Sequence, residues 1–82
     1  MKNREELYKD ITSILSEMFE IPLEKIKGDS KLYEELDLDS IDAVDLVVKL
    51  QELTQIKIPP TEFKTVRSVG DVVETVYALL QK

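Results

Sequence analysis

The residues that could carry chemistry are concentrated in one stretch of the chain, from Glu34 to Glu52. Seven acidic side chains fall there and Lys49 is the only base, which gives the stretch a charge of −6. The whole chain has the same net charge, so its other residues are neutral on balance. Ser40 lies in the middle of these acids, in the run Asp39-Ser40-Ile41-Asp42. A serine and a set of carboxylates are therefore the chemical groups to be explained.

Several kinds of site are excluded by the residue types that the chain lacks. It has no Cys and no His, which excludes a thiolate nucleophile, a zinc cluster and a Ser-His-Asp triad. Gly28 and Gly70 are the only glycines and lie far apart, so no glycine-rich loop can hold a nucleotide phosphate. The negative charge repels nucleic acid and anionic lipid, and basic proteins are the expected partners.

No apolar run is long enough to span a membrane, and the amino terminus lacks the apolar stretch of a signal peptide. These features predict a cytoplasmic location.

The acids themselves fit known ligand and enzyme sites poorly. The run from Asp37 to Asp42 imitates the start of a calcium loop, but Ile41 and Val48 stand where oxygen ligands are needed. Paired carboxylates that cleave a glycosidic bond need a concave cleft, for which a domain of 82 residues has little volume. A hydrolase built on Ser40 would lack a base. Ser40 is therefore either a chemical handle or the N-cap of a helix.

The apolar pattern of the amino-terminal half predicts one helix and one long loop. Apolar residues recur at steps of three and four from Arg4 to Glu20, with Asn3 and Glu6 spaced as a capping box, and the helix must end before Pro22. Residues 21–39 show no sustained period. Their apolar side chains are expected to pin this loop to the core: Leu23, Ile26, Leu32, Tyr33, Leu36 and Leu38.

The carboxyl-terminal half predicts two further helices and a short turn. The second helix starts after Asp39 or Ser40 and runs to about Leu53, ahead of Pro59-Pro60. A short turn is expected over residues 61–65, and a last helix follows the capping pair Ser68 and Asp71. We therefore predict an all-α fold, a small four-helix bundle with three main helices and one short one, as a single domain over residues 1–82.

A helical wheel gives the second helix two apolar faces. One face points to the core and consists of Ala43, Leu46, Val47, Leu50 and Leu53. Nearly opposite it, beside Asp42, Asp45 and Glu52, lie Ile41, Val44 and Val48. These three residues either meet another part of the bundle or form an apolar strip for a partner that offers Lys or Arg.

The run Leu36-Asp37-Leu38-Asp39-Ser40-Ile41-Asp42-Ala43-Val44-Asp45-Leu46 resembles the attachment motif of acyl carrier proteins. The resemblance extends to Ile56-Lys57-Ile58-Pro59 and to the ending Ser68-Val69-Gly70-Asp71-Val72-Val73, and it covers roughly residues 4 to 80. It implies a four-helix bundle that holds acyl groups as thioesters on a covalent 4′-phosphopantetheine arm. Ser40 matches the residue that receives this arm from coenzyme A.

The resemblance also implies partners and roles for other residues. It implies a monomer that is not itself an enzyme and that meets a phosphopantetheinyl transferase and acyl-loading, condensing and acyl-transfer enzymes with basic docking patches. The positions that match the partner contacts of the family are Asp39, Ile41, Val44, Asp45, Val48 and Glu52. Those that match the lining of its acyl pocket are Leu46, Val47, Leu50, Ile58 and Val66. No metal site is implied.

The pathway stays open at this point. Glycine commonly stands one or two residues before the attachment Asp in this family, whereas this chain has Asp37-Leu38. A carrier for fatty-acid synthesis, for a polyketide or related lipid pathway, or for amino-acyl groups fits these residues. The alternative from another class is an unmodified helical interaction module in which Ser40 merely caps a helix.

Overall fold

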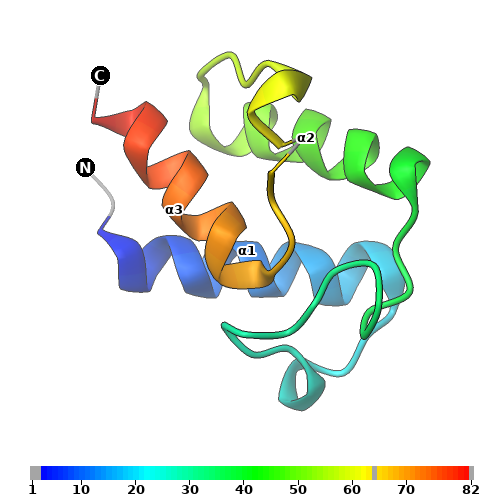
Figure 1. Cartoon of the computed structure of the whole chain (residues 1–82). Coiled ribbons are helices and arrows are strands. Elements are labelled where there is room, and N and C mark those ends of the chain that lie inside the picture. The colour runs from blue at the N-terminus through cyan, green and yellow to red at the C-terminus, as the bar shows by residue number, and fades with distance from the viewer. Residues whose placement is uncertain (1–2, 64, 82) are drawn as a thin grey trace.

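The computed structural model describes residues 3–63 and 65–81 and confirms the predicted all-α bundle. Its three main helices are α1 (Arg4–Phe19), α2 (Ser40–Thr54) and α3 (Val69–Leu80). Two short 3-10 turns, η1 (Leu23–Lys25) and η2 (Pro60–Phe63), lie in the connections. The second of these is the short element expected at residues 61–65, of which Lys64 lies outside the described residues. In Figure 1, α3 crosses α1, and α2 lies on the other side of the bundle from the start of α1.

The helix ends form where the local signals predict them. The Asn3 side chain accepts a hydrogen bond from the Glu6 N–H at 2.8 Å, which caps α1. Glu20 then ends α1 in the left-handed conformation, ahead of Ile21-Pro22. Ser68 and Asp71 form a reciprocal capping box at the start of α3. Each of these bonds joins residues close in sequence, so a sequence pattern can predict it.

The core is built from aliphatic side chains of all three helices. Leu7, Ile11 and Leu15 supply the α1 side of the core and are fully buried. Leu46 and Leu50 of α2 are buried as the wheel predicts, but Leu53 is 37% exposed and does not belong to the core. A wheel gives a direction only, and it carries no information about where the neighbouring helices stop covering that direction.

The connection between α1 and α2 is only partly pinned by its apolar side chains. Ile26, Leu32, Leu36 and Leu38 are buried, as expected. Leu23 and Tyr33, which hydrophobicity alone also predicts to be inside, are 57% and 37% exposed. A segment without a period does not reveal which of its apolar residues point inward.

A short backbone ladder fastens this connection to the start of α3. The N–H of Leu32 donates to the Arg67 carbonyl at 2.9 Å, that of Val69 to the Ser30 carbonyl at 3.1 Å, and that of Gly70 to the Gly28 carbonyl at 2.7 Å. A Cβ on Gly70 would lie 2.9 Å from the Gly28 oxygen, so this close approach requires glycine. The ladder holds the segment that leads to Ser40 against the bundle.

Candidate functional site

The geometry at the start of α2 separates Ser40 from the capping role. Asp39 is the N-cap: its Oδ1 accepts from the Asp42 N–H at 2.9 Å. The Asp39 N–H in turn donates to Asp42 Oδ2 at 3.2 Å, which completes a capping box. Ser40 comes after this cap and is the first residue of the helix itself. The interpretation of Ser40 as a helix cap is therefore wrong.

The Ser40 side chain is exposed, and the described part of the chain offers its hydroxyl no hydrogen-bond partner. No group of acids that could hold a metal ion is found among the described residues. A free hydroxyl at a helix N-terminus suits a covalent phosphate, because the positive end of the helix dipole stabilises a phosphate's charge. The chemistry that this position supports is thus the attachment of a group, and the described residues place no histidine or thiol beside it.

The apolar strip predicted on α2 is exposed in the structure. Ile41 is 71% exposed, Val44 54% and Val48 48%. The alternative in which these side chains pack against another part of the bundle is therefore excluded. Exposed β-branched residues at a helical spacing of three and four form a continuous apolar surface beside Ser40.

Carboxylates lie beside this strip. Asp39, Asp45 and Glu52 are exposed, and Asp42 is half-buried by its part in the capping box. The Lys49 Nζ lies 3.8 Å from Glu52 Oε2, a surface pair that partly offsets the charge of Glu52. Asp45 therefore presents the less compensated charge of the two.

The residues that match an acyl pocket are all buried. Leu46, Val47 and Leu50 come from α2, and Ile58 and Val66 come from the segments on either side of η2. All five belong to one hydrophobic cluster. The Gln51 side chain accepts from the Ile58 N–H at 2.8 Å, which holds the segment after α2 against that helix.

Asp71 stabilises the end of the ladder next to Arg67. The Arg67 N–H donates to its Oδ2 at 3.0 Å and the Ser68 N–H to the same oxygen at 3.2 Å. These bonds, the Arg67 bond first, and the nearby charge of Lys31 hold the pKa of Asp71 below its ordinary value of 3.8. Its contribution to stability is present above that value and is lost as the pH falls through the lower, folded-state pKa.

Sequence reasoning missed one feature of the segment before the serine. Asp37 adopts a φ of 57°, in the left-handed region. The available signal was its place in the motif, because glycine commonly stands one or two residues before the attachment Asp in the family that the motif resembles. A left-handed backbone at this position explains why glycine suits it.

Comparison with known proteins identifies the family to which these features correspond. The family model described as "Phosphopantetheine attachment site" matches residues 9–76. The chain is 53% identical over 75 residues to acyl carrier protein 2 of Ralstonia nicotianae, covering 92% of this chain and 93% of that protein. It is 39% identical over 67 residues to the acyl carrier protein of Wolinella succinogenes, covering 82% and 88%.

The same fold occurs in a solved structure. The acyl carrier protein from Enterococcus faecalis superposes with a TM-score of 0.76, covering 94% of this chain and 98% of that one, at 22% identity. At this level of identity, the similarity shows a shared fold.

None of the described helices is long and apolar enough to cross a membrane.

Proposed function

This chain belongs to the family of acyl carrier proteins with a phosphopantetheine attachment site, and from that premise we propose that Ser40 is the residue that carries the 4′-phosphopantetheine arm. The chain is a carrier of acyl groups and not an enzyme. Its prosthetic group supplies the thiol that holds an acyl group as a thioester, and the chain has no Cys of its own.

The observation that carries the assignment of Ser40 is that its hydroxyl is exposed while Asp39 performs the capping. A serine that only capped the helix would direct its oxygen to a backbone N–H of the first turn. The residues around Ser40 fit the arm: the hydroxyl is free to form the phosphodiester, and the first turn of α2 favours a negative phosphate.

The face of α2 beside Ser40 is proposed to dock the enzymes that load and use the arm. Its apolar centre is Ile41, Val44 and Val48, and its acidic edge is Asp39, Asp45 and Glu52. A partner that fits this face offers an apolar surface flanked by Lys or Arg. We assign this role to a phosphopantetheinyl transferase and to acyl-loading, condensing and acyl-transfer enzymes.

The interior of the bundle is proposed to shelter the acyl chain. Five apolar, buried residues of one cluster would surround it, so that the alkyl chain leaves water: Leu46, Val47, Leu50, Ile58 and Val66.

The proposal also includes a monomer of one domain, located in the cytoplasm. Of the pathways open to such a carrier, we propose fatty-acid or related lipid synthesis, because the relatives are named acyl carrier proteins.

Intact-mass measurement tests the role of Ser40. Apo protein is incubated with coenzyme A and a phosphopantetheinyl transferase of broad specificity. We expect the wild type to gain one phosphopantetheine and Ser40→Ala to gain none. Ser13→Ala, a change of an exposed serine on α1, is the matched control and should be modified like the wild type.

Two outcomes would contradict the assignment. An unmodified wild type would favour the helical interaction module, and a modified Ser40→Ala would move the arm to another residue. Thermal melts of the two variants show whether each has kept its fold. Because Ser40 is not the cap, we expect Ser40→Ala to melt close to the wild type.

A further inference from the structure

A hollow of about 540 Å³ lies between α1, α3 and the turn at Gly28. Its walls include Tyr8 of α1 and Val73 of α3, and its edges include Glu5 and Glu74. We call it the α1–α3 groove. Its lining residues come from α1, α3 and the long connection, so it is separate from the exposed face of α2.

Gly28 keeps this groove open. The other glycine at the groove, Gly70, is required by its contact with the Gly28 carbonyl. Gly28 has no such requirement: its φ is not left-handed, and an added Cβ would meet only Tyr8 Cε1, at an ordinary 3.9 Å. A larger side chain at position 28 would therefore be tolerated by the backbone and would lie over the Tyr8 ring. The absence of a side chain leaves that ring accessible.

The edge of the groove is acidic. Among the described residues that line it, Glu5, Asp71 and Glu74 contribute carboxylates and Arg4 contributes the single base. Arg4 is already engaged, because its Nε donates to Glu74 Oε2 at 2.7 Å and its guanidinium lies 4.3 Å from the centre of the Tyr77 ring.

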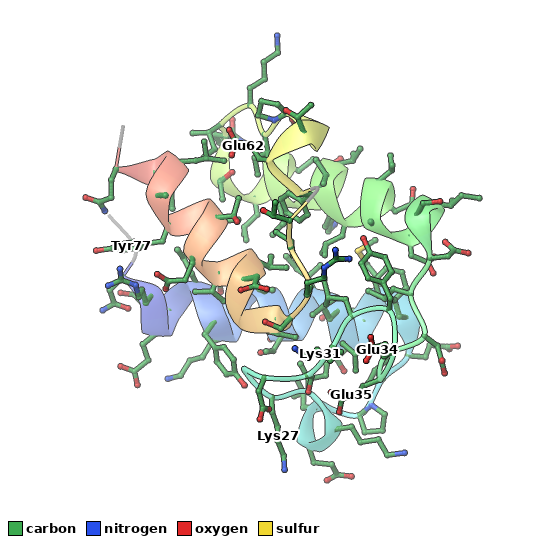
Figure 2. All side chains as sticks on the ribbon, viewed as in Figure 1. Lys27, Lys31, Glu34, Glu35, Glu62 and Tyr77 are labelled. Carbon is green, nitrogen blue, oxygen red and sulfur yellow. The ribbon has the colours of Figure 1, made fainter. Side chains whose placement is uncertain are left out.

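Two of these carboxylates have a basic neighbour, since Glu74 pairs with Arg4 and Asp71 lies near the charge of Lys31. Figure 2 shows Tyr77, over which Arg4 lies, at the outer end of α3, and Lys27 pointing away from the helices. Lys27 lines a different hollow, which is formed by residues of the connection between α1 and α2. Glu5 therefore faces the groove without a basic partner among the described residues.

Charge decides among the possible occupants. Nucleic acid, anionic lipid and a second copy of this chain, with its net charge of −6, are all repelled by an acidic edge. The apolar walls favour an apolar side chain, and the hollow is open to solvent, which suits a side chain of a docked segment better than an enclosed small molecule.

We propose that the α1–α3 groove is a second docking site, for a basic segment of a partner protein. The segment inserts one aromatic side chain between Tyr8 and Val73 and places Lys or Arg beside Glu5. The site does not involve Ser40 or the exposed face of α2. It fixes a bound partner at a second point of the carrier and goes beyond the attachment of the arm.

Two synthetic peptides test the groove by NMR titration of the holo-protein. The first contains a single Trp flanked by Lys and Arg, and the second has Ala in place of the Trp. We expect the Trp peptide to shift the amide signals of Tyr8, Gly28, Gly70 and Val73. The Ala peptide, which has the same charge, should leave these four signals nearly unmoved.

Variants of the groove then separate the contributions of its shape and its charge to binding of the Trp peptide. Gly28→Leu should weaken binding of the Trp peptide by about tenfold or more because it covers the Tyr8 ring. Glu5→Lys should weaken it and reduce its salt dependence. Ser13→Leu adds the same side chain at an exposed neutral position outside the groove and should bind like the wild type.

Two results would overturn the proposal. One is that the Trp peptide shifts only the α2 signals of Ile41, Val44 and Val48. The other is that Gly28→Leu, shown by its melting curve to be folded, binds the Trp peptide as the wild type does. If Gly28→Leu does not fold, the test rests on Glu5→Lys and on the comparison of the two peptides. Unchanged binding by Glu5→Lys together with equal signal shifts from both peptides would then overturn the proposal. Gly28→Leu should still gain its arm at Ser40, so the two proposals fail independently.

Discussion

At the scale of single residues, the backbone of Asp37 is the unusual feature beside Ser40. The left-handed region costs a residue with a Cβ about 1–2 kcal/mol, although Asp tolerates it better than most. The neighbouring Leu36 and Leu38 are buried, and their N–H groups donate to the carbonyls of Lys31 and Leu32. The chain therefore turns sharply at Asp37 between two anchored leucines.

Asp37→Gly should stabilise the fold slightly. Relief of the left-handed strain outweighs the extra flexibility of glycine in the unfolded chain, which gives an expected gain of up to about 1 kcal/mol. Denaturant unfolding measures it. The control is Glu34→Gly, at a position without a positive φ, which should lower the stability by about 0.5–1 kcal/mol. A loss for Asp37→Gly as large as that of the control would show that the strain is negligible.

At the scale of elements, α2 is a helix with two apolar faces of different purpose. Its inner face holds Leu46 and Leu50 in the core, and its outer face exposes Ile41 and Val44. Burial stabilises the fold, whereas an exposed apolar side chain adds little to it. The outer face is therefore free to serve a partner.

Truncation to Ala distinguishes the two faces. Ile41→Ala and Val44→Ala should each cost less than about 1 kcal/mol of unfolding free energy, and Leu46→Ala on the order of 2–5 kcal/mol. The first two should instead weaken docking of the loading enzyme. Denaturant melts of the three variants provide the comparison. Equal losses of stability would show that Ile41 and Val44 are buried structure, and the docking face would have to be abandoned.

The ladder between the long connection and α3 is a second element whose strength depends on a small residue. Ala is favoured over Gly by about 1 kcal/mol inside a helix, but at Gly70 its Cβ would meet the Gly28 oxygen. We expect the collision to prevail, so Gly70→Ala should lose about 1–3 kcal/mol of stability.

The matched control for this prediction is Gly28→Ala on the other side of the same contact. Its Cβ meets Tyr8 at 3.9 Å, so its stability should stay within about 0.5 kcal/mol of the wild type. Thermal or denaturant unfolding of both variants decides. A Gly70→Ala variant as stable as the wild type would mean that the ladder can shift without cost.

At the scale of the whole molecule, the charge is uneven. The stretch from Glu34 to Glu52 carries the entire net charge of −6. An uneven distribution of this kind directs the approach of a basic partner, and it acts on the association rate more than on folding. Asp45 is exposed on this face, whereas Glu52 is partly offset by Lys49.

Asp45→Lys should slow loading by the transferase at low salt, and the difference from the wild type should shrink as salt is added. Glu17→Lys makes the same change of charge at an exposed position of α1 and should slow loading much less. Initial rates of arm transfer over a range of ionic strength measure both. Equal rates for Asp45→Lys and the wild type at low salt would count against the acidic docking face.

The features that follow from the sequence alone depend on neighbours along the chain. The caps at Asn3 and Ser68 follow from side chains three residues apart, and the structure has them as predicted. The two faces of α2 follow from the helical period, and the structure has them except that Leu53, predicted for the core face, is exposed. The motif around Ser40 is equally local, and its residue types and order suffice to indicate the arm. These features can be predicted from the sequence because they depend on short-range hydrogen bonds and on the helical period.

Other features depend on contacts between distant parts of the chain, and only the tertiary packing decided them. The exposure of Leu23 and Leu53, the meeting of Gly28 with Gly70 and the groove beside Tyr8 depend on how three helices and a long connection pack. Even the choice between Asp39 and Ser40 as the cap needed the backbone, since both residue types suit that position. Packing brings together residues up to about 70 positions apart, as in the Arg4–Glu74 pair, and no local pattern contains that information.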